Sequence, residues 1–271
     1  MSPKHSFQFS AFLRALFLIC SAVVCTVLIG PPAIFSGVLD RSGRWASFFQ
    51  SLWVKCLLKT NGIHLNLEGM GSLNQDQSYI LVSNHASILD ILAIISAAPF
   101  PVRFIAKKSL IWFPIFGWFL YAADHILVDR ERNSSAFRSL KKASSLLKKG
   151  ISIVVFPEGT RSPDGDVKEF RRGAFLLAQH SKFPVVPISA SGTYEMLPRQ
   201  GWCFWPGTMH IRMSDPIPTR DLSRQESGDL MGRVRETIIR NLEQESAERE
   251  LSGEEQGERH DTGMQVASVD G

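Results

Sequence analysis

A predicted strand gives way to a predicted helix within the stretch Val82-Ser83-Asn84-His85-Ala86-Ser87-Ile88-Leu89-Asp90. The apolar residues before it, 79–82, are typical of a buried strand, and residues 88–95 are typical of an apolar helix. The pattern therefore places a histidine in the loop at the carboxyl end of a strand. Such loops are where α/β folds usually carry their functional residues.

His85 and Asp90 are candidates for a catalytic base and the acid that orients it. A neutral imidazole can accept the proton of a hydroxyl group, and a neighbouring carboxylate can fix its tautomer and stabilise the imidazolium. Residues five apart do not face each other on a regular helix, so the two can meet only if the chain turns at the junction. The alternative is that His85 caps the helix and that Asp90 is a solvated acid in its first turn.

Outward from this stretch, strand and helix patterns alternate over residues 62–220. The predicted strands are residues 63–67, 79–82, 102–106, 125–128, 151–156, 185–189 and 209–213, and the predicted helices are 88–96, 134–148, 173–181 and 228–245. This alternation predicts an α/β domain, spanning residues 62–247, with a mixed central sheet flanked by helices. Pro187 lacks a donor for a sheet hydrogen bond, so its strand is expected at an edge or a bulge.

The amino-terminal residues 1–61 are strongly apolar. No charged residue occurs in 15–39, which as a helix would be long enough to cross a hydrocarbon core of about 30 Å. Gly30-Pro31-Pro32 is expected to end that helix near Ile29, and a second apolar helix is predicted over 45–58. We expect a membrane-associated two-helix motif. A single spanning helix and a cleaved signal peptide are the alternatives.

The charge of the chain is uneven. The net charge is +4, but residues 243–271 carry nine acidic and two basic residues, which leaves +11 on the rest. A basic body suits anionic lipid or phosphorylated substrates, and no basic-aromatic motif suggests a nucleic-acid partner. Residues 248–271 are predicted to be a disordered acidic tail whose removal after Ser246 leaves activity nearly unchanged. The four cysteines have neither metal-ligand nor disulfide spacing, which indicates a reduced compartment.

A second candidate loop, Phe156-Pro157-Glu158-Gly159-Thr160-Arg161, follows the strand at 151–156. Gly159 permits close backbone approach, and the planar fork of Arg161 matches a phosphate. An anion site is therefore predicted here, with a tight turn carrying a surface arginine as the alternative. Lys107 and Arg130 also follow strand patterns and are either two more walls of a phosphate site or solvated charges. The aromatic stretch 111–120 between them forms core or an acyl-chain groove.

These motifs, in this order, resemble those of the lysophospholipid and glycerol-phosphate acyltransferases, and most closely the bacterial 1-acylglycerol-3-phosphate acyltransferases. The resemblance covers residues 80–189 and is carried by Asn84-His85-x4-Asp90 and by 156–161. Lys107-x-Ser109-Leu110 and Asp129-Arg130 match the block between them, although many members have glutamate where Ser109 stands.

The resemblance implies that His85 is the general base and that Asp90 orients it. The residues implied to hold the glycerol-phosphate are Glu158, Gly159, Thr160, Arg161, Lys107 and Arg130. The implied reaction moves a fatty acyl group from acyl-CoA or acyl-carrier protein to the free hydroxyl of 1-acylglycerol-3-phosphate (lysophosphatidic acid), giving phosphatidic acid without a cofactor. The implied location is a membrane, such as a bacterial inner membrane, with the site on the cytoplasmic side.

Several alternatives remain open at this point. The acceptor could be glycerol-3-phosphate, another lysophospholipid or an amino-acid lipid, or the protein could bind membrane lipid without chemistry at His85. A lipid esterase would favour a Gly-x-Ser-x-Gly elbow, which the sequence lacks. Acyl transfer from a thioester requires no serine or cysteine nucleophile, and no metal-ligand constellation is present, so we expect direct transfer without a metal.

Overall fold

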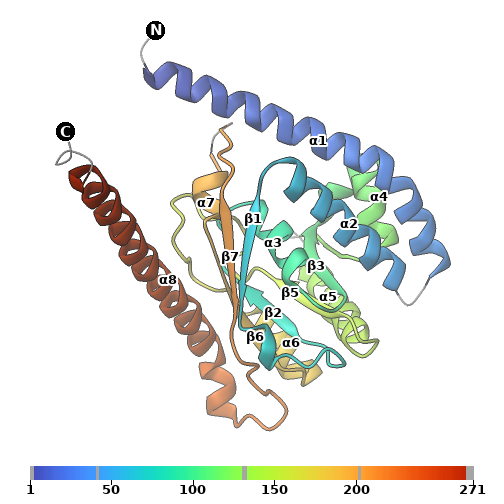
Figure 1. Ribbon diagram of the computed structural model, residues 1–271. Helices are drawn as coiled ribbons and strands as arrows, with labels where there is room; N and C mark the ends of the chain where they lie inside the picture. Colours follow the sequence, from blue (N-terminus) through green and yellow to red (C-terminus); the bar gives the residue numbers. More distant parts are fainter. Residues whose placement is uncertain (1–2, 41–42, 130–132, 201–202, 267–271) are drawn as a thin grey trace.

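The computed structural model describes residues 3–40, 43–129, 133–200 and 203–266 (Figure 1). The strands are β1 (His64–Glu68), β2 (Ile80–Ser83), β3 (Val102–Lys107), β4 (Ile126–Val128), β5 (Ser152–Val155), β6 (Val185–Ser191) and β7 (Thr208–Met213). The helices are α1 (Pro3–Leu39), α2 (Arg44–Thr60), α3 (Leu89–Ala97), α4 (Phe116–Ala122), α5 (Asn133–Leu147), α6 (Gly173–Ser181), α7 (Thr193–Met196) and α8 (Arg224–Val266). Two short 3-10 turns are η1 (Met70–Ser72) and η2 (Lys108–Trp112).

The core of the fold is a seven-stranded sheet in the order β1-β7-β6-β2-β5-β3-β4. Every neighbouring pair is parallel except β6 with β7. Alternate residues of the central strands face opposite layers: Leu81 packs with α2 and α3, whereas Ile80 and Val82 pack with α5, α6 and α8. The predicted mixed α/β sheet flanked by helices is therefore confirmed, and all seven predicted strands are present within two residues of their bounds.

Of the two positions expected for the strand that contains Pro187, an edge or a bulge, the edge is wrong. The strand that contains Pro187 lies in the middle of the sheet, between β2 and β7, not at its edge. Its pairing with β7 begins only at Ile188, and the carbonyl of Pro187 accepts from the amide of Ser214, just beyond the end of β7. Because the amide and carbonyl of one residue point to the same side of a strand, the proline nitrogen faces this gap in the ladder.

The predicted break at residues 30–32 is also wrong, because α1 continues through them to Leu39 and α2 begins at Arg44. Gly30 serves close packing: a Cβ atom there would lie 2.3 Å from Cγ2 of Ile115, just before α4. Prolines are tolerated inside apolar membrane helices where neighbouring groups satisfy the freed backbone. The two-helix motif itself is present, with α1 and α2 packed side by side (Figure 1).

A buried arginine fastens this two-helix motif to the sheet. Arg103 of β3 is 1% exposed, and its guanidinium donates to the carbonyl of Gly43 at 3.1 Å, to Oγ of Ser47 at 3.0 Å and to the carbonyl of Ala123. Burial lowers the pKa of Arg103 to about 10, which leaves it charged at neutral pH. These bonds tie the turn between α1 and α2 to the end of α4.

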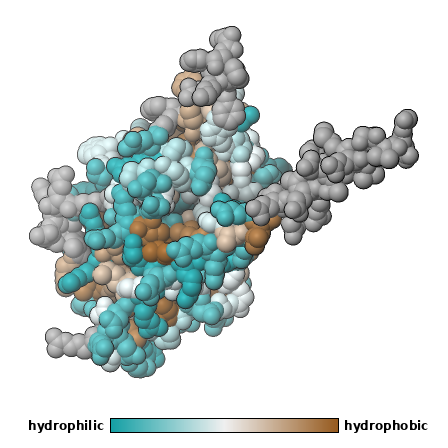
Figure 2. All heavy atoms as spheres, turned by 90° about the vertical axis from the view of Figure 1, so that its left-hand side faces the viewer, coloured by the Kyte–Doolittle hydropathy of each residue, from teal (hydrophilic) through white to brown (hydrophobic). Residues whose placement is uncertain are grey.

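A broad apolar surface faces outward from α1, α2, η2 and α4. Its large exposed side chains are Phe9, Phe12, Leu13, Leu16, Phe17, Ile19, Val23, Val24, Val27, Leu28, Phe35, Leu39, Trp45, Phe48, Leu52, Trp112, Phe113, Trp118 and Tyr121. In α1, residues 9–36 are long and apolar enough to cross a membrane. Figure 2 shows that the side carrying α8 is, by contrast, mainly hydrophilic. This many large apolar side chains exposed on helices that contact one another indicates membrane association.

Charges placed on this surface are expected to release the protein from membranes. Val24→Asp combined with Leu28→Asp changes two side chains that are 55% and 69% exposed, so folding should be preserved. Each aspartate in an apolar membrane helix costs about 2.5–3.5 kcal/mol. We expect the variant to move from the membrane to the soluble fraction, whereas Gln225→Asp with Ser246→Asp on the exposed side of α8 should stay with membranes. Unchanged sedimentation of the α1 variant would show that another surface binds the membrane.

The carboxyl-terminal prediction needs correction as well. The structure continues α8 without interruption to Val266, through residues expected to form a disordered tail from 248. Glutamate, arginine, glutamine and leucine are good helix formers, so a helix that is already packed on the sheet at Leu230 and Val234 can extend beyond it.

Candidate active site

The junction between β2 and α3 brings His85 and Asp90 together. His85 lies in the loop after β2 and Asp90 in the first turn of α3, and Nδ1 of the imidazole is 2.9 Å from Oδ2 of Asp90. The same oxygen accepts the backbone amides of Ala86 at 2.8 Å and Ser87 at 2.9 Å. The carboxylate thus holds the whole turn as well as the imidazole, which explains how residues five apart can meet.

The geometry fixes which imidazole nitrogen can act as a base. Because Nδ1 faces a carboxylate, it carries the proton, and Nε2 keeps its lone pair. Nε2 has no protein partner within the residues the structure describes, and the His85 side chain is 14% exposed. The ring of Phe156 stacks on the imidazole with centroids 4.0 Å apart. His85 is therefore held on one face and one edge, and its basic nitrogen is left available.

The neighbouring strand β6 completes the support of this pair. The amide side chain of Asn84 donates to the carbonyl of Ala190 at 2.8 Å and accepts its N–H at 2.9 Å. Oγ1 of Thr193, just beyond β6, donates to Oδ1 of Asp90 at 2.5 Å. Thr193 escaped the sequence analysis because threonine is common at helix starts and no local spacing linked it to Asp90, 103 residues away.

The second predicted loop folds directly against the first. Oε1 of Glu158 accepts the backbone N–H of His85 at 2.8 Å, and the N–H of Ser162 donates to the carbonyl of His85 at 2.7 Å. Glu158 is only 4% exposed, and burial raises its pKa to about 7. These contacts give Glu158 a part in fixing the His85 loop. The role implied for it by resemblance, holding the glycerol-phosphate, stays a prediction.

The raised pKa of Glu158 predicts a pH-dependent stability. A carboxyl whose pKa is about 7 when folded, against 4.5 ordinarily, binds more protons in the folded state between those values. Its contribution to the free energy of unfolding is therefore greatest below about pH 4.5 and falls as the pH rises to about 7. Glu158→Gln should remove this slope, so its melting temperature in detergent should change less than that of the wild type between about pH 5 and 8. The exposed control Glu169→Gln should behave like the wild type, and identical slopes in all three proteins would contradict the assignment.

Gly159 and Arg161 lie on the outer side of the same loop. Gly159 has a φ of 77°, in the left-handed region, and a Cβ there would come within 3.1 Å of the guanidinium of Arg171. Thr160 and Arg161 are half-exposed. Arg161 lines a cavity of about 320 Å³ together with Arg199 and with apolar side chains of α1, Ala15, Leu18 and Ile19.

Arg199 is a candidate functional residue that the sequence analysis did not single out. Its Nη1 donates to the backbone carbonyl of Arg161 at 3.0 Å, which places two guanidinium groups beside one cavity. The adjacent Leu197 accepts a hydrogen bond from Oγ of Ser87 at 2.7 Å, so the cavity borders the His85 loop. The signal in the sequence was weak, because Arg199 follows the short helix α7 rather than a strand.

The structure says less about the two remaining predicted site residues, Lys107 and Arg130. Lys107 ends β3 and is exposed, at the same edge of the sheet as the β2 and β5 loops because these strands are parallel. Arg130 lies outside the described residues, so its role in binding phosphate stays a prediction. Within those residues, no group of three or more His, Cys, Asp or Glu side chains could hold a metal ion.

A cavity of about 150 Å³ with mainly apolar walls lies between the two-helix motif and the sheet. It is bounded by α1, α2, α3, β3 and α4, with Trp53, Ile91, Phe104, Phe116 and Phe119 among its walls. The aromatic stretch 111–120 therefore serves as the wall of a cavity on its inner side and as exposed apolar surface on its outer side.

The sheet thus carries an acid–histidine pair at the carboxyl end of its central strand β2, and neighbouring loops carry Arg161 and Arg199. Residues 64–191 match the family model described as Acyltransferase.

Similar proteins have names that are more specific than that of the family model. The 1-acyl-sn-glycerol-3-phosphate acyltransferase alpha of Homo sapiens is 34% identical over 179 residues, which are 66% of this chain and 63% of the human protein. The 1-acyl-sn-glycerol-3-phosphate acyltransferase of Saccharomyces cerevisiae is 33% identical over 186 residues, 68% of this chain and 61% of the yeast protein. The match thus spans a little under two thirds of the length of these relatives.

A solved structure has the same fold. The crystal structure of the 1-acyl-sn-glycerophosphate (LPA) acyltransferase, PlsC, from Thermotoga maritima superimposes with a TM-score of 0.77 at 29% sequence identity. The likeness covers 88% of this chain and 97% of the Thermotoga chain, so it includes helices outside the central sheet.

Proposed function

We propose that this protein transfers a fatty acyl group from a thioester donor, acyl-CoA or acyl-carrier protein, to the free hydroxyl of lysophosphatidic acid, forming phosphatidic acid. The observation that carries the proposal is the His85–Asp90 pair, whose loop borders, through the bond between Ser87 and Leu197, a cavity lined by Arg161 and Arg199. The names of the human, yeast and Thermotoga relatives supply the acceptor class.

The chemistry follows from the tautomer of His85. Nε2 takes the proton from the acceptor's hydroxyl as its oxygen attacks the thioester carbonyl. The carbon–sulfur bond then breaks as the tetrahedral intermediate collapses, and the imidazolium returns the proton to the departing thiolate. Asp90 stabilises the imidazolium between these steps through its bond to Nδ1. Every proton is accounted for by one imidazole, so neither an acyl-enzyme nor a nucleophilic side chain is needed.

The acceptor would bind with its phosphate between Arg161 and Arg199. Charge-assisted hydrogen bonds from a guanidinium fork suit a phosphate, and the apolar α1 wall of the same cavity suits the acceptor's own acyl chain. A lysophospholipid could therefore enter from the membrane along α1 without exposing its chain to water. Lys107 and Arg130 would add positive charge at the same edge of the sheet, and Glu158, Gly159 and Thr160 would shape the loop that presents Arg161.

The donor's acyl chain would occupy the apolar cavity between the two-helix motif and the sheet. The walls of that cavity are mainly apolar, so burying methylene groups there gains about 0.8 kcal/mol for each. Residues 1–61 would then serve both as membrane anchor and as one wall of the donor site, ahead of an acyltransferase domain over residues 62–247. The donor thioester and the site would face the cytoplasm, as in the inner membrane of a bacterium.

The experiment that tests this proposal gives the purified full-length protein a labelled acyl-CoA and, in separate reactions, different acceptors. Lysophosphatidic acid, glycerol-3-phosphate, lysophosphatidylcholine and a lyso amino-acid lipid cover the alternatives. We expect labelled phosphatidic acid to be the main product. A different labelled product would reassign the acceptor, and no product with either acyl-CoA or acyl-carrier protein would favour a lipid-binding protein instead.

A further inference from the structure

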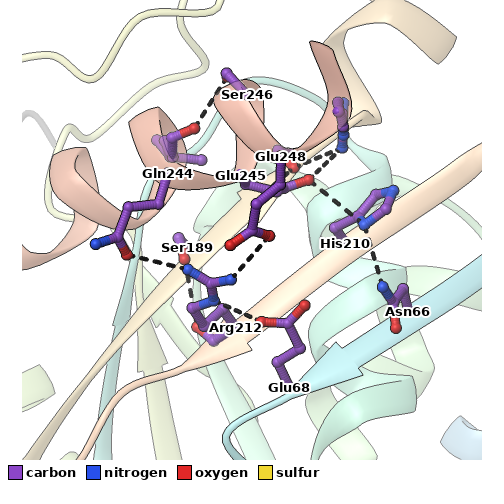
Figure 3. A network of polar contacts seen from close by, with 12 residues as sticks. Asn66, Glu68, Ser189, His210, Arg212, Gln244, Glu245, Ser246 and Glu248 are labelled. Carbon is purple, nitrogen blue, oxygen red and sulfur yellow. Dashed lines mark hydrogen bonds and ion pairs between the residues drawn. The ribbon is translucent and has the colours of Figure 1, made fainter. Parts of the chain in front are cut away.

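The far end of the described chain reaches back to the loop after β6. Oγ of Ser191, the last residue of β6, donates to Oε2 of Glu245 on α8, and Nη2 of Arg249 donates to the same Oγ at 2.9 Å. Arg249 also pairs with Glu245, and Nδ1 of His210 lies 3.5 Å from Oε1 of Glu245 (Figure 3). Side chains of α8 thereby hold Ser191 from the side opposite to the sheet's core.

A second network extends the attachment of α8 along the same strands. Arg212 of β7 donates to Glu68 of β1 at 2.6 Å, and Arg212 also reaches Gln244 at 3.3 Å and Glu248 at 3.5 Å on α8 (Figure 3). Exposed ion pairs of this kind each contribute little. Together, however, the contacts of Arg212 fix the position of α8 relative to β1 and β7. They thereby also fix the position at which Glu245 and Arg249 contact Ser191.

Two residues beyond Ser191, the chain reaches Asp90. Gly192 has a φ of 76°, and a Cβ there would lie 2.3 Å from the carbonyl oxygen of Thr208, so this turn packs tightly against β7. Thr193 follows with no exposed surface, and its hydroxyl is 2.5 Å from Oδ1 of Asp90. The position of Thr193 is thus set by Ser191 and Gly192, which α8 and β7 hold in place.

We propose that Thr193 is a positioning residue for the His85–Asp90 pair, and that α8 maintains that position through Glu245 and Arg249. This inference rests on the proposed function, because it assigns a catalytic consequence to the orientation of His85. It also assigns a function to residues of the acidic carboxyl-terminal segment that composition alone predicted to be dispensable.

The argument depends on how the two oxygens of Asp90 are occupied. Oδ2 accepts hydrogen bonds from the imidazole and from two backbone amides, whereas Oδ1 accepts one from the hydroxyl of Thr193. Asp90 is fully buried, so loss of that hydroxyl leaves a desolvated oxygen without its donor and lets the carboxylate turn. A turned carboxylate misorients the imidazole. Thr193 itself points at Asp90 and not at the phosphate cavity, so kcat should fall while both KM values stay the same.

The first test replaces the threonine alone. Thr193→Val keeps the shape and removes the donor, and we expect kcat to fall about 10- to 100-fold, the usual effect of losing a hydrogen bond to a charged group. Thr193→Ser restores the donor and should recover most of kcat. The matched control is Thr219→Val: Thr219 is 2% exposed and donates to the carbonyl of Phe183 at 2.8 Å. It should lower the melting temperature comparably without changing kcat.

The second test shortens α8 on either side of Arg249. A chain ending after Ser246 loses Glu248 and Arg249, whereas a chain ending after Leu251 keeps both. We expect the shorter chain to lose kcat in the same way as Thr193→Val, with unchanged KM values, and the longer chain to match the wild type. Arg249→Met in the full chain should reproduce the loss and guards against misfolding of the truncated protein.

The outcomes separate this inference from the proposed function. If the wild type makes phosphatidic acid and a folded Thr193→Val protein turns over equally fast, Thr193 does not position the pair and the proposed function stands. If Thr193→Val is slow but the chain ending after Ser246 and Arg249→Met are both unaffected, the contribution of α8 is wrong. A wild type that acylates no acceptor removes both proposals together.

Discussion

Replacing His85 with alanine is expected to lower kcat for acyl transfer by at least about 10²- to 10⁴-fold, the contribution of a positioned general base. The fold should survive, because His85 is at the end of a loop whose backbone is held independently by Glu158 and Ser162. Membrane binding should not change. The measurement is labelled phosphatidic acid formed per enzyme under saturating donor and acceptor.

Two further variants show whether His85 acts together with Asp90. Asp90→Asn keeps the shape but removes the charge that fixes the imidazole's tautomer, so it too should be severely impaired. The double variant should be little worse than His85→Ala, because the two residues act as one unit. His180→Ala, at an exposed histidine of α6, is the matched control and should be fully active. A folded His85→Ala protein with near-normal turnover would return His85 to a structural role.

Removing the guanidinium of Arg161 is expected to raise the KM for the phosphorylated acceptor about 10- to 100-fold, because a charge-assisted hydrogen bond contributes about 1.5–3 kcal/mol. The KM for the acyl donor should change little. Arg161→Lys should recover only part of the loss, since a point charge does not replace the planar fork. Arg199→Ala should raise the same KM, because Arg199 lines the same cavity.

The matched control for these variants is Arg172→Ala. Arg172 is an exposed arginine next to the start of α6 and does not line the cavity, so its loss should leave both KM values unchanged. An unchanged acceptor KM in Arg161→Ala would remove Arg161 from the phosphate site. An increase confined to the donor's KM would instead place the donor's phosphates in this cavity.

The parts of this fold that could be predicted from the sequence are those with strong local signals. Each central strand is a short apolar run, and the His85–Asp90 spacing at the end of β2 located the pair before its geometry was visible. Burial on both faces of a parallel sheet gives such runs, so their order predicted the α/β class. The match of residues 64–191 to one family model reflects the same motifs.

The errors have one physical cause, which is that distant contacts outweighed local propensity. Gly30-Pro31-Pro32 was expected to end the helix near Ile29, yet α1 continues and the missing side chain of Gly30 makes room for Ile115. Composition predicted disorder from residue 248, yet Arg249 meets Ser191 across 58 positions of sequence. Thr193 and Arg199 are recognised as candidate site residues only through their hydrogen bonds to distant parts of the chain, at Asp90 and Arg161. The local sequence pattern does not contain information about contacts between residues that are far apart in the chain.

The central claim is direct, base-assisted transfer from the thioester to the lysophosphatidate hydroxyl, and one measurement tests it most directly. The purified protein is mixed with labelled acyl donor in the absence of acceptor, and its intact mass is followed before and after lysophosphatidic acid is added. The account predicts no acyl–protein adduct at any time, and labelled phosphatidic acid only after the acceptor arrives. An adduct that forms without acceptor and decays at the catalytic rate when acceptor is added would contradict it.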